Sequence, residues 1–464
     1  MENLIKQIDR KIESYADSLI EDTVRLVNIK SEQGKPEANA PFGKGPKKVL
    51  DTVWEMAEKE GLFTKDYGVG VISAAMYDTQ PDLGIWLHAD VVPAGEGWIY
   101  PPYDATLYKD CIIGRGATDN KGQLAAIFNL FKIFKELNIN LKYNPALYVG
   151  SNEENGMKDL TGVEGNLYAK GFNNVCEFPK MSLVPDSGFP VGYGGKGLAT
   201  FKLKSRTKLH GFKFTAGQKQ TPGVAEAVFD TLDFPDALGE CDVKKSDKSY
   251  VSIFTPPRHT ASPDPDGNMI TKLSDALLNA GVVQKEDRYI LEFFKAVSLD
   301  AQGKMLGIYR DSKLMVPTTV YAQTIDCNDG FCELTIKVRF PIETTYDEMK
   351  EKLSAKCDEM GFDVIGMGGH KPFINDNLEM VNMLCQIANS VTGDDKKPYV
   401  AGVTYAHYLP NAYVFGMNGC KVPDDFLPGH GSAHGVDECV SIERLKRAMR
   451  IYARTLLELN NTEW

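Results

Sequence analysis

Helix and strand signals alternate along the first 190 residues of the 464-residue chain, and this alternation most constrains its fold. Three stretches space their apolar residues as helices do, and three short apolar runs are typical of buried strands. These segments are residues 3–28 (helix), 46–60 (helix), 83–92 (strand), 121–137 (helix), 145–150 (strand) and 181–184 (strand). This alternation of helices and strands predicts an α/β fold with a mostly parallel sheet and helices on both faces.

The pattern changes near residue 191. The stretch YGGKG at 193–197 looks like a flexible hinge, and strand-like alternation follows it. Two further strands are predicted at 316–325 and 331–340, and a helix at 345–360. Near residue 375 the helical α/β pattern resumes and continues to the last residue. We therefore predict that an α+β domain, residues 191–374, is inserted into a larger domain formed by residues 1–190 and 375–464.

The charge balance and the termini exclude several classes of function. The chain has 52 Lys and Arg residues against 63 Asp and Glu residues, a formal net charge of −11, which argues against a nucleic-acid partner. The N-terminal segment is amphipathic and charged and lacks the apolar core of a secretory signal. No uncharged apolar run approaches 18 residues, so no membrane-spanning helix is expected. The nine cysteines are scattered without a CxxC pair, which favours reduced cysteines in a cytoplasmic protein.

Side chains that bind metals follow several of the predicted strands. They are His88 and Asp90 in LHADVVPAGEGW, Asp119 in GRGATDNKG, Glu153 and Glu154 in GSNEENGM, Asp186 in LVPDSGFP and, near the end of the chain, His434 in AHGVDE. Each motif alone has an ordinary explanation, since an aspartate after a glycine-rich turn usually caps a helix and a glutamate pair usually faces solvent. Their recurrence at strand ends favours one shared site, because ligands of open α/β sheets bind beyond the carboxyl ends of the strands.

The chemistry of this set suits two divalent cations. Imidazole and carboxylate groups without thiolates are ligands for zinc, and also for manganese or cobalt. One carboxylate must bridge the two ions, about 3.5–4 Å apart. Glu153 and Glu154 are adjacent and point to different sides of the chain, so one can bind metal while the other acts as a base. Asp90 is placed to accept the second ring N–H of His88.

In this order, and over nearly the whole chain, these motifs resemble those of the dinuclear zinc peptidase superfamily that includes carnosinase, acetylornithine deacetylase, aminoacylase and the PepV-type bacterial dipeptidases. The resemblance implies two ligand sets that share Asp119: His88, Asp119 and Asp186, and Asp119, Glu154 and His434. It also implies a cis peptide bond between Asp119 and Asn120. Glu153 would be the general base and Asp90 the residue behind His88.

The inserted domain resembles the lid of the same superfamily. RHTASPDPDGN contains His259 at the position of a histidine that polarises the substrate carbonyl, and VRFP at 338–341 places Arg339 where relatives hold the substrate carboxylate. Gly402 and Thr404 precede and begin the loop VTYAHYLPNA and are candidate substrate contacts, as is Lys219, which stands where relatives have asparagine. The lid is long, with 73 residues between Asp186 and His259 (259 − 186). This length resembles the PepV type, so a monomer is expected to be active, and a dimer stays open.

The expected activity is the hydrolysis of dipeptides with a free amino end. A water between the two cations would attack the peptide carbonyl while Glu153 accepts its proton. An amidohydrolase that removes the acyl group of N-acyl amino acids is the first alternative. An inactive peptide-binding homologue is the second, because Lys219 replaces the family asparagine in the lid and His407 replaces the family arginine after TYA.

Overall fold

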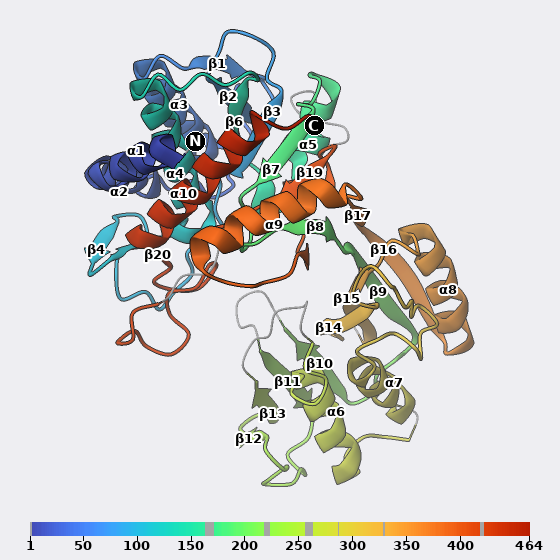
Figure 1. Cartoon of the computed structure of the whole chain (residues 1–464). Coiled ribbons are helices and arrows are strands. Elements are labelled where there is room, and N and C mark those ends of the chain that lie inside the picture. Colours follow the sequence, from blue (N-terminus) through green and yellow to red (C-terminus); the bar gives the residue numbers. More distant parts are fainter. Residues whose placement is uncertain are drawn as a thin grey trace. The chain divides into compact units, whose positions relative to one another are not determined.

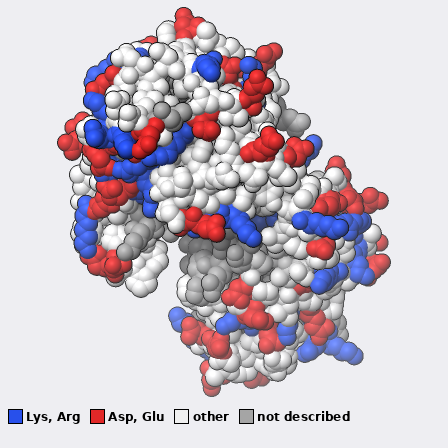
Figure 2. Space-filling view, in the orientation of Figure 1, with Lys and Arg blue, Asp and Glu red and all other residues white. Residues whose placement is uncertain are grey.

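The chain divides into two compact units in the computed structural model, which describes residues 2–162, 171–217, 223–255, 263–285, 287–327, 330–417 and 422–464. Unit 1 comprises Met1–Gly195 and Asn375–Trp464, and unit 2 comprises Lys196–Ile374 (Figure 1). On the face drawn in Figure 2, basic and acidic side chains are interspersed over both units. Among the described residues, no helix is long and apolar enough to cross a membrane.

The sheet of unit 1 is mixed, with four parallel strands at its centre. In spatial order its strands are β1 (Phe63–Asp66), β2 (Val71–Ala75), β6 (Pro145–Gly150), β3 (Leu83–His88), β7 (Met181–Val184), β19 (Ala412–Val414) and β8 (Gly192–Gly195), and β18 (Tyr399–Ala401) also pairs with β8. The strands β6, β3, β7 and β19 are parallel, whereas β1 and β2 form an antiparallel edge. The predicted α/β class is confirmed. The YGGKG stretch, expected to be a hinge, is instead mostly strand β8 and leads directly into the first strand of unit 2.

Six long helices bury their apolar residues in one cluster with alternate residues of the central strands. They are α1 (Glu2–Ser14), α2 (Ala16–Val27), α3 (Lys44–Lys59), α4 (Gly122–Glu136), α9 (Leu378–Thr392) and α10 (Ile442–Leu459), and Figure 1 shows α9 and α10 crossing in front of the sheet. On β3 the residues in this cluster are Leu83, Ile85 and Leu87. The single helix predicted over residues 3–28 is two helices, which meet at Tyr15.

The opposite side of β3 packs against aromatic rings. Trp86 stacks on Tyr148 of β6 with ring centroids 4.3 Å apart, and Phe172 and Tyr405 meet the indole edge-on. The two latter rings come from short elements, η3 (Phe172–Asn174) and η4 (Tyr405–His407), and α5 (Lys158–Thr161) contacts η3. This packing fixes the ends of β3 and β6, from which the candidate site is built. A separate small sheet joins β4 (Thr106–Tyr108), β5 (Cys111–Ile113) and β20 (Cys439–Ser441).

Unit 2 is an antiparallel sheet covered on one face by helices. Its strands in spatial order are β12 (Asp242–Lys245), β13 (Ser249–Phe254), β11 (Val224–Phe229), β10 (Phe212–Ala216), β14 (Thr319–Asp326), β15 (Phe331–Phe340), β9 (Gly197–Lys208) and β16 (Phe362–His370). The helices are α6 (Met269–Ala280), α7 (Arg288–Leu299) and α8 (Tyr346–Glu359), and the short β17 (Phe373–Ile374) ends the unit. Leu334, Ile336 and Val338 of β15 lie in the apolar cluster beneath the helices. The alternate residues of β15 therefore project from the other face.

The hairpin between β14 and β15 corrects the expectation that all cysteines are reduced. Cys327 and Cys332 form a disulfide there, whereas six other described cysteines form none. The expectation rested on the absence of a CxxC pair. Cysteines five residues apart can nevertheless face each other when a tight turn brings the ends of two antiparallel strands together.

Candidate metal centre

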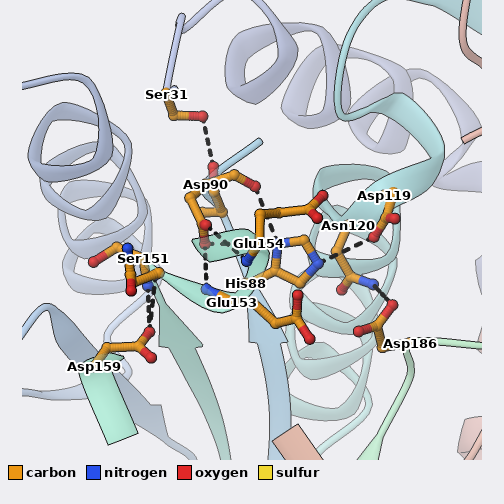
Figure 3. A network of polar contacts seen from close by, with 12 residues as sticks. Ser31, His88, Asp90, Asp119, Asn120, Ser151, Glu153, Glu154, Asp159 and Asp186 are labelled. Carbon is orange, nitrogen blue, oxygen red and sulfur yellow. Dashed lines mark hydrogen bonds and ion pairs between the residues drawn. The ribbon is translucent and has the colours of Figure 1, made fainter. Parts of the chain in front are cut away.

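Four of the predicted residues come together at the carboxyl ends of three adjacent parallel strands. His88 is the last residue of β3, Glu153 and Glu154 begin the short helix η2 (Glu153–Asn155) directly after β6, and Asp186 follows β7. Figure 3 shows these side chains converging with Asp119 above the sheet edge. This is the place where open α/β sheets bind ligands.

Asp119 and His434 reach the same place from outside the sheet. Asp119 belongs to the irregular turn η1 (Ala117–Lys121) before α4, and the peptide bond to Asn120 is cis, as the family resemblance implied. The side chains of Asp119 and Asn120 do not cap α4, because the residue before the helix is Lys121 and no side-chain cap is formed. Asn120 instead donates its side-chain N–H to the carbonyl of Pro185, at 3.0 Å, which connects η1 to the end of β7.

The Asp119 carboxylate faces both imidazoles with different oxygens. Its Oδ1 lies 3.0 Å from Nε2 of His88, and its Oδ2 lies 3.1 Å from Nε2 of His434. The same Nε2 of His434 is 2.9 Å from Oε1 of Glu154. A carboxylate that presents one oxygen to each of two ligand groups is the geometry needed to bridge two cations.

Two groups of side chains have ligand atoms within 4.8 Å of one another and could each hold a metal ion. They are His88, Asp119 and Asp186, and Asp119, Glu154 and His434. These are the two ligand sets that the family resemblance implied. All the donors are imidazole nitrogens or carboxylate oxygens, so the set fits zinc, manganese or cobalt better than a thiolate-dependent centre.

The electrostatics of the cluster also fit a cation site. Burial disfavours a charge on His88, but the hydrogen bond and charge of Asp119, helped by the charges of Asp186 and Glu153, raise its pKa well above the ordinary value. Hydrogen bonds to Asp119 and Glu154 raise the pKa of His434 to about 11. The acidic groups thus stabilise positive charge at both rings, as they would stabilise a bound cation.

Glu153 belongs to neither ligand group. Its burial and the nearby charge of Asp186 raise the pKa of its carboxyl group well above the ordinary value. In Figure 3 its carboxylate lies beside the His88 ring, on the side of Asp186. A carboxyl group that is next to the ligands, outside both sets and has a raised pKa is suited to proton transfer near neutral pH.

Asp90 supports the site in a different way from the one predicted. The ring Nδ1 of His88 lies 3.0 Å from the main-chain oxygen of Asp90 but 3.7 Å from its carboxylate, so the backbone and not the side chain accepts the ring N–H. The carboxylate accepts the backbone N–H groups of Glu153 and Glu154, both at 3.1 Å. Asp90 is fully buried, and burial raises its pKa to about 7. It therefore fixes the base and one ligand residue relative to His88.

Glu438 is a supporting residue that the sequence interpretation missed. It is fully buried, accepts three backbone N–H groups of residues 116–119 at 2.9–3.1 Å, and pairs with Arg115 at 2.6 Å. It follows His434 by four residues in the motif AHGVDE (438 − 434). One segment thus carries a candidate ligand and holds the turn that contains Asp119. The sequence contained both partners, the glutamate in AHGVDE and the arginine in GRGATDNKG, but gave no sign that they pair.

Asp159 holds the loop after β6 in a similar manner. It accepts the backbone N–H groups of Ser151 at 2.8 Å and of Asn152 at 3.0 Å, and the hydroxyl of Tyr405 donates to it. Thr404, predicted to contact substrate, is buried, and its hydroxyl caps η4 by accepting the N–H of Ala406 at 3.2 Å. The loop at 402–412 therefore supports the glutamate pair from behind.

Four predicted residues remain, Gly402, Arg339, His259 and Lys219. Gly402 is exposed near the start of the same loop, and Arg339 lies on β15 of unit 2. His259 and Lys219 lie outside the described residues. His430, the histidine nearest in sequence to His434, is hydrogen-bonded to Asp437 at 2.6 Å.

Comparison with known proteins agrees with this geometry. The sequence model for peptidase family M20/M25/M40 matches residues 85–458. A Staphylococcus saprophyticus protein that carries a provisional dipeptidase name is 27% identical over 487 residues, which cover 97% of this chain and 98% of the relative.

Two solved structures share the fold at low identity. The dipeptidase Dug1p from Saccharomyces cerevisiae superposes with a TM-score of 0.61 at 13% identity, covering 100% of both chains. An M20 family metallo-carboxypeptidase from Sulfolobus solfataricus gives a TM-score of 0.57 at 16% identity, covering 94% of this chain and 98% of the other. The two names denote different substrates, so the shared fold does not by itself determine which peptide is cleaved.

Proposed function

The chain belongs to peptidase family M20/M25/M40, and from this premise we propose that it is a dinuclear metallopeptidase that hydrolyses dipeptides with a free amino end. The observation that carries the proposal is the Asp119 carboxylate, which presents one oxygen to His88 and the other to His434. The relative from Staphylococcus saprophyticus, similar over nearly its whole length, supports the choice of dipeptides.

In this proposal His88, Asp119 and Asp186 hold one cation, and Asp119, Glu154 and His434 hold the other. Zinc is the preferred ion, with manganese or cobalt as alternatives, because the donors are imidazole and carboxylate. When bound, two such cations would lower the pKa of a water molecule and polarise the peptide carbonyl.

Glu153 is the proposed general base. It accepts a proton from the attacking water and returns it to the leaving amine. Its position supports this role, because it lies beside the ligand residues and belongs to neither ligand group. Asp90 serves as a positioning residue, because its carboxylate holds the Glu153 backbone and its carbonyl accepts the ring N–H of His88.

The two ends of the dipeptide would meet groups of opposite charge. The acidic residues near the cation site attract the free amino group, and Arg339 pairs with the terminal carboxylate, ideally through two parallel hydrogen bonds. His259 would stabilise the carbonyl oxygen as negative charge develops on it, which is worth roughly 3–4 kcal/mol for a single good donor. Lys219 and Gly402 stay as proposed substrate contacts. The long inserted unit, with His259 in the same chain, supports an active monomer.

Metal analysis combined with a substrate panel tests this function. We expect about two cations per chain, and Ala-X dipeptides hydrolysed faster than the matching N-acetyl amino acids in zinc, manganese or cobalt. Tripeptides and longer peptides should be cleaved more slowly. Faster release of acetate from the N-acetyl compounds would assign the chain as an acyl-amino-acid amidohydrolase. Full metal content without any hydrolysis would make it a peptide-binding homologue.

A further inference from the structure

Arg115 is a buried residue of unit 1 whose guanidinium contacts two segments of the candidate metal centre. Its side chain is 1% exposed. One terminal nitrogen, Nη1, donates to the carboxylate of Glu438 at 2.6 Å. The other, Nη2, reaches the main-chain oxygens of Ala94 and His434, both at 3.3 Å, and that of Pro93 at 3.5 Å. Arg115 therefore joins the loop that contains Pro93 to the segment that carries the candidate ligand His434.

Trp98 closes the same loop over the guanidinium. The centre of its indole ring lies 5.1 Å from the guanidinium carbon of Arg115, and the indole N–H donates to the main-chain oxygen of Ala94 at 2.9 Å. A planar guanidinium can lie over an aromatic ring and donate to several acceptors in fixed directions at the same time. A lysine at this position would keep a positive charge near Glu438 but would lack the second nitrogen that reaches the carbonyls. This set of contacts therefore requires arginine.

His434 depends on its backbone more than the other candidate imidazole does. The side chain of His434 is 52% exposed, whereas that of His88 is 1% exposed and has its ring Nδ1 3.0 Å from the main-chain oxygen of Asp90. The φ angle of His434 is 62°, in the left-handed region that a residue with a side chain adopts at a cost in free energy. Such a conformation persists only where surrounding contacts fix it. The hydrogen bond from Arg115 to the His434 carbonyl is a contact of this kind.

The contacts of Arg115 concern one ligand group more than the other. His434 belongs only to the group that also contains Asp119 and Glu154, which we call the second group. The first group takes its imidazole from the last residue of β3, which is fixed by pairing with β6. Loss of the Nη2 contacts should therefore weaken the second group and leave the first nearly unchanged.

We propose that Arg115 is a positioning residue that sets the cation affinity of the second group by fixing the backbone of His434. This inference rests on the proposed dinuclear function and adds a residue to it. Arg115 binds no cation itself and acts through the His434 carbonyl.

Arg115→Lys tests the inference, because it keeps a positive charge near Glu438 and removes the Nη2 donor. The metal-free full-length protein is titrated with zinc by calorimetry, in competition with a chelator of known zinc affinity. We expect the wild type to bind two zinc ions, and the variant to bind one of them about 10–100-fold more weakly and the other with nearly unchanged affinity. Arg454→Lys is the matched control, since Arg454 donates twice to Asp9, at 3.1 and 2.8 Å, and its two zinc affinities should equal those of the wild type.

Cobalt in place of zinc identifies the weakened ion. The ring N–H of His88 is buried and directed at the main-chain oxygen of Asp90, so in the NMR spectrum of the cobalt-loaded protein it should be strongly shifted and exchange slowly with water. For Arg115→Lys at one cobalt ion per chain, we expect this signal and no shifted signal from the His434 ring. Equal weakening of both ions, unchanged affinities, or a shifted His434 signal without that of His88 overturns the inference while the dinuclear function stands. A wild type that binds fewer than two ions removes the proposed function and this inference with it.

Trp98→Leu decides the question if Arg115→Lys does not fold. Trp98 is partly exposed, so the fold should tolerate the change, and leucine removes both the ring over Arg115 and the hydrogen bond to Ala94. We expect the same ion to bind about threefold more weakly, the effect of losing one cation–π contact. A folded Trp98→Leu variant with wild-type affinity for both ions overturns the inference.

Discussion

The candidate metal centre of unit 1 and the sheet face of unit 2 that carries Lys337 and Arg339 are built on opposite principles. Around the metal centre, three buried carboxylates that are not candidate ligands accept the backbone N–H groups of the loops that carry the ligands; they are Asp90, Asp159 and Glu438. On this face of unit 2, the positions of the charged side chains follow from strand register. The comparison teaches that changes near the metal centre should act through loop positions, whereas changes on the lid sheet should act through the lost charge alone.

The largest expected effect is the loss of turnover in Glu153→Gln, at the metal centre. The variant should keep both metal ions and lose about 10²–10⁴-fold in kcat, because it removes the general base and no candidate ligand. Neighbouring Glu154→Gln should lose metal and activity together, since Glu154 is in a ligand group. Metal content per chain and dipeptide turnover, measured on the same preparations, distinguish the two variants. Near-normal turnover of Glu153→Gln would disprove its assignment as the base.

On the lid side, Arg339→Met should lower kcat/KM for dipeptides by about 10–100-fold, the loss of charge-assisted hydrogen bonds to one carboxylate. Metal content should not change. Dipeptide amides, which lack the terminal carboxylate, should react equally well with the variant and the wild type. Arg206→Met is a suitable control, because Arg206 is bound to Asp358 and Asp363 on the surface of unit 2. An equal loss for amides and acids would contradict the assignment of Arg339.

Glu438→Gln tests whether backbone anchoring holds the metal centre together. We expect a loss of metal affinity toward the lower end of the roughly 10–100-fold range known for outer-shell residues, because the amide keeps one acceptor oxygen. Competition with a zinc chelator measures it without reference to activity. Glu443→Gln, an exposed change near the start of α10, is the control. Unchanged affinity in a folded Glu438→Gln variant would show that the 116–119 turn holds its shape without this anchor.

The smallest effect is expected at the ion pairs that Lys202 and Lys204 form with Glu333 on the unit 2 sheet. Lys202 and Lys204 lower the pKa of Glu333 below its ordinary value, so the ion pair stabilises the fold above pH 4.5 and this contribution is lost as the pH falls through the folded-state pKa. Glu333→Gln should therefore be less stable than the wild type at pH 7, by no more than about 1 kcal/mol because the groups are partly exposed. Urea unfolding at pH 7 and at pH 3 should show the difference shrink at the lower pH. A difference that grows on acidification would contradict the pairing.

Much of the fold and the identity of the clustered residues could be predicted from strand and helix periodicity. The strand ends at His88, Glu153 and Asp186 are local features, and parallel pairing brings them together. The break between α1 and α2 at Tyr15 was missed because the apolar spacing continues across it. The antiparallel edge formed by β1 and β2 was missed because short strands at an edge give little periodic signal.

Supporting contacts could not be predicted, for a physical reason. Whether His88 donates to the carboxylate or to the main-chain oxygen of Asp90 depends on differences of less than 1 Å, which side-chain spacing does not determine. The pairing of Glu438 with the 116–119 turn joins residues more than 300 positions apart. Whether Cys327 and Cys332 lie opposite each other depends on the register of the two strands, which the sequence pattern predicted only coarsely.

The wide separation in the chain between Glu438 and the turn it anchors has a consequence for biosynthesis. The Asp119 turn receives its anchor, and its second imidazole, only from residues that leave the ribosome after the whole inserted unit has been translated. A nascent chain that ends before residue 430 therefore has three of the five proposed ligands, which lie at strand ends. It also has Asp119, but on a turn that is not yet anchored, and it lacks His434, which contacts Glu154 in the complete protein. The second of the two proposed cation sites is therefore completed only when the last part of the chain has been made, and premature termination yields a chain that lacks it.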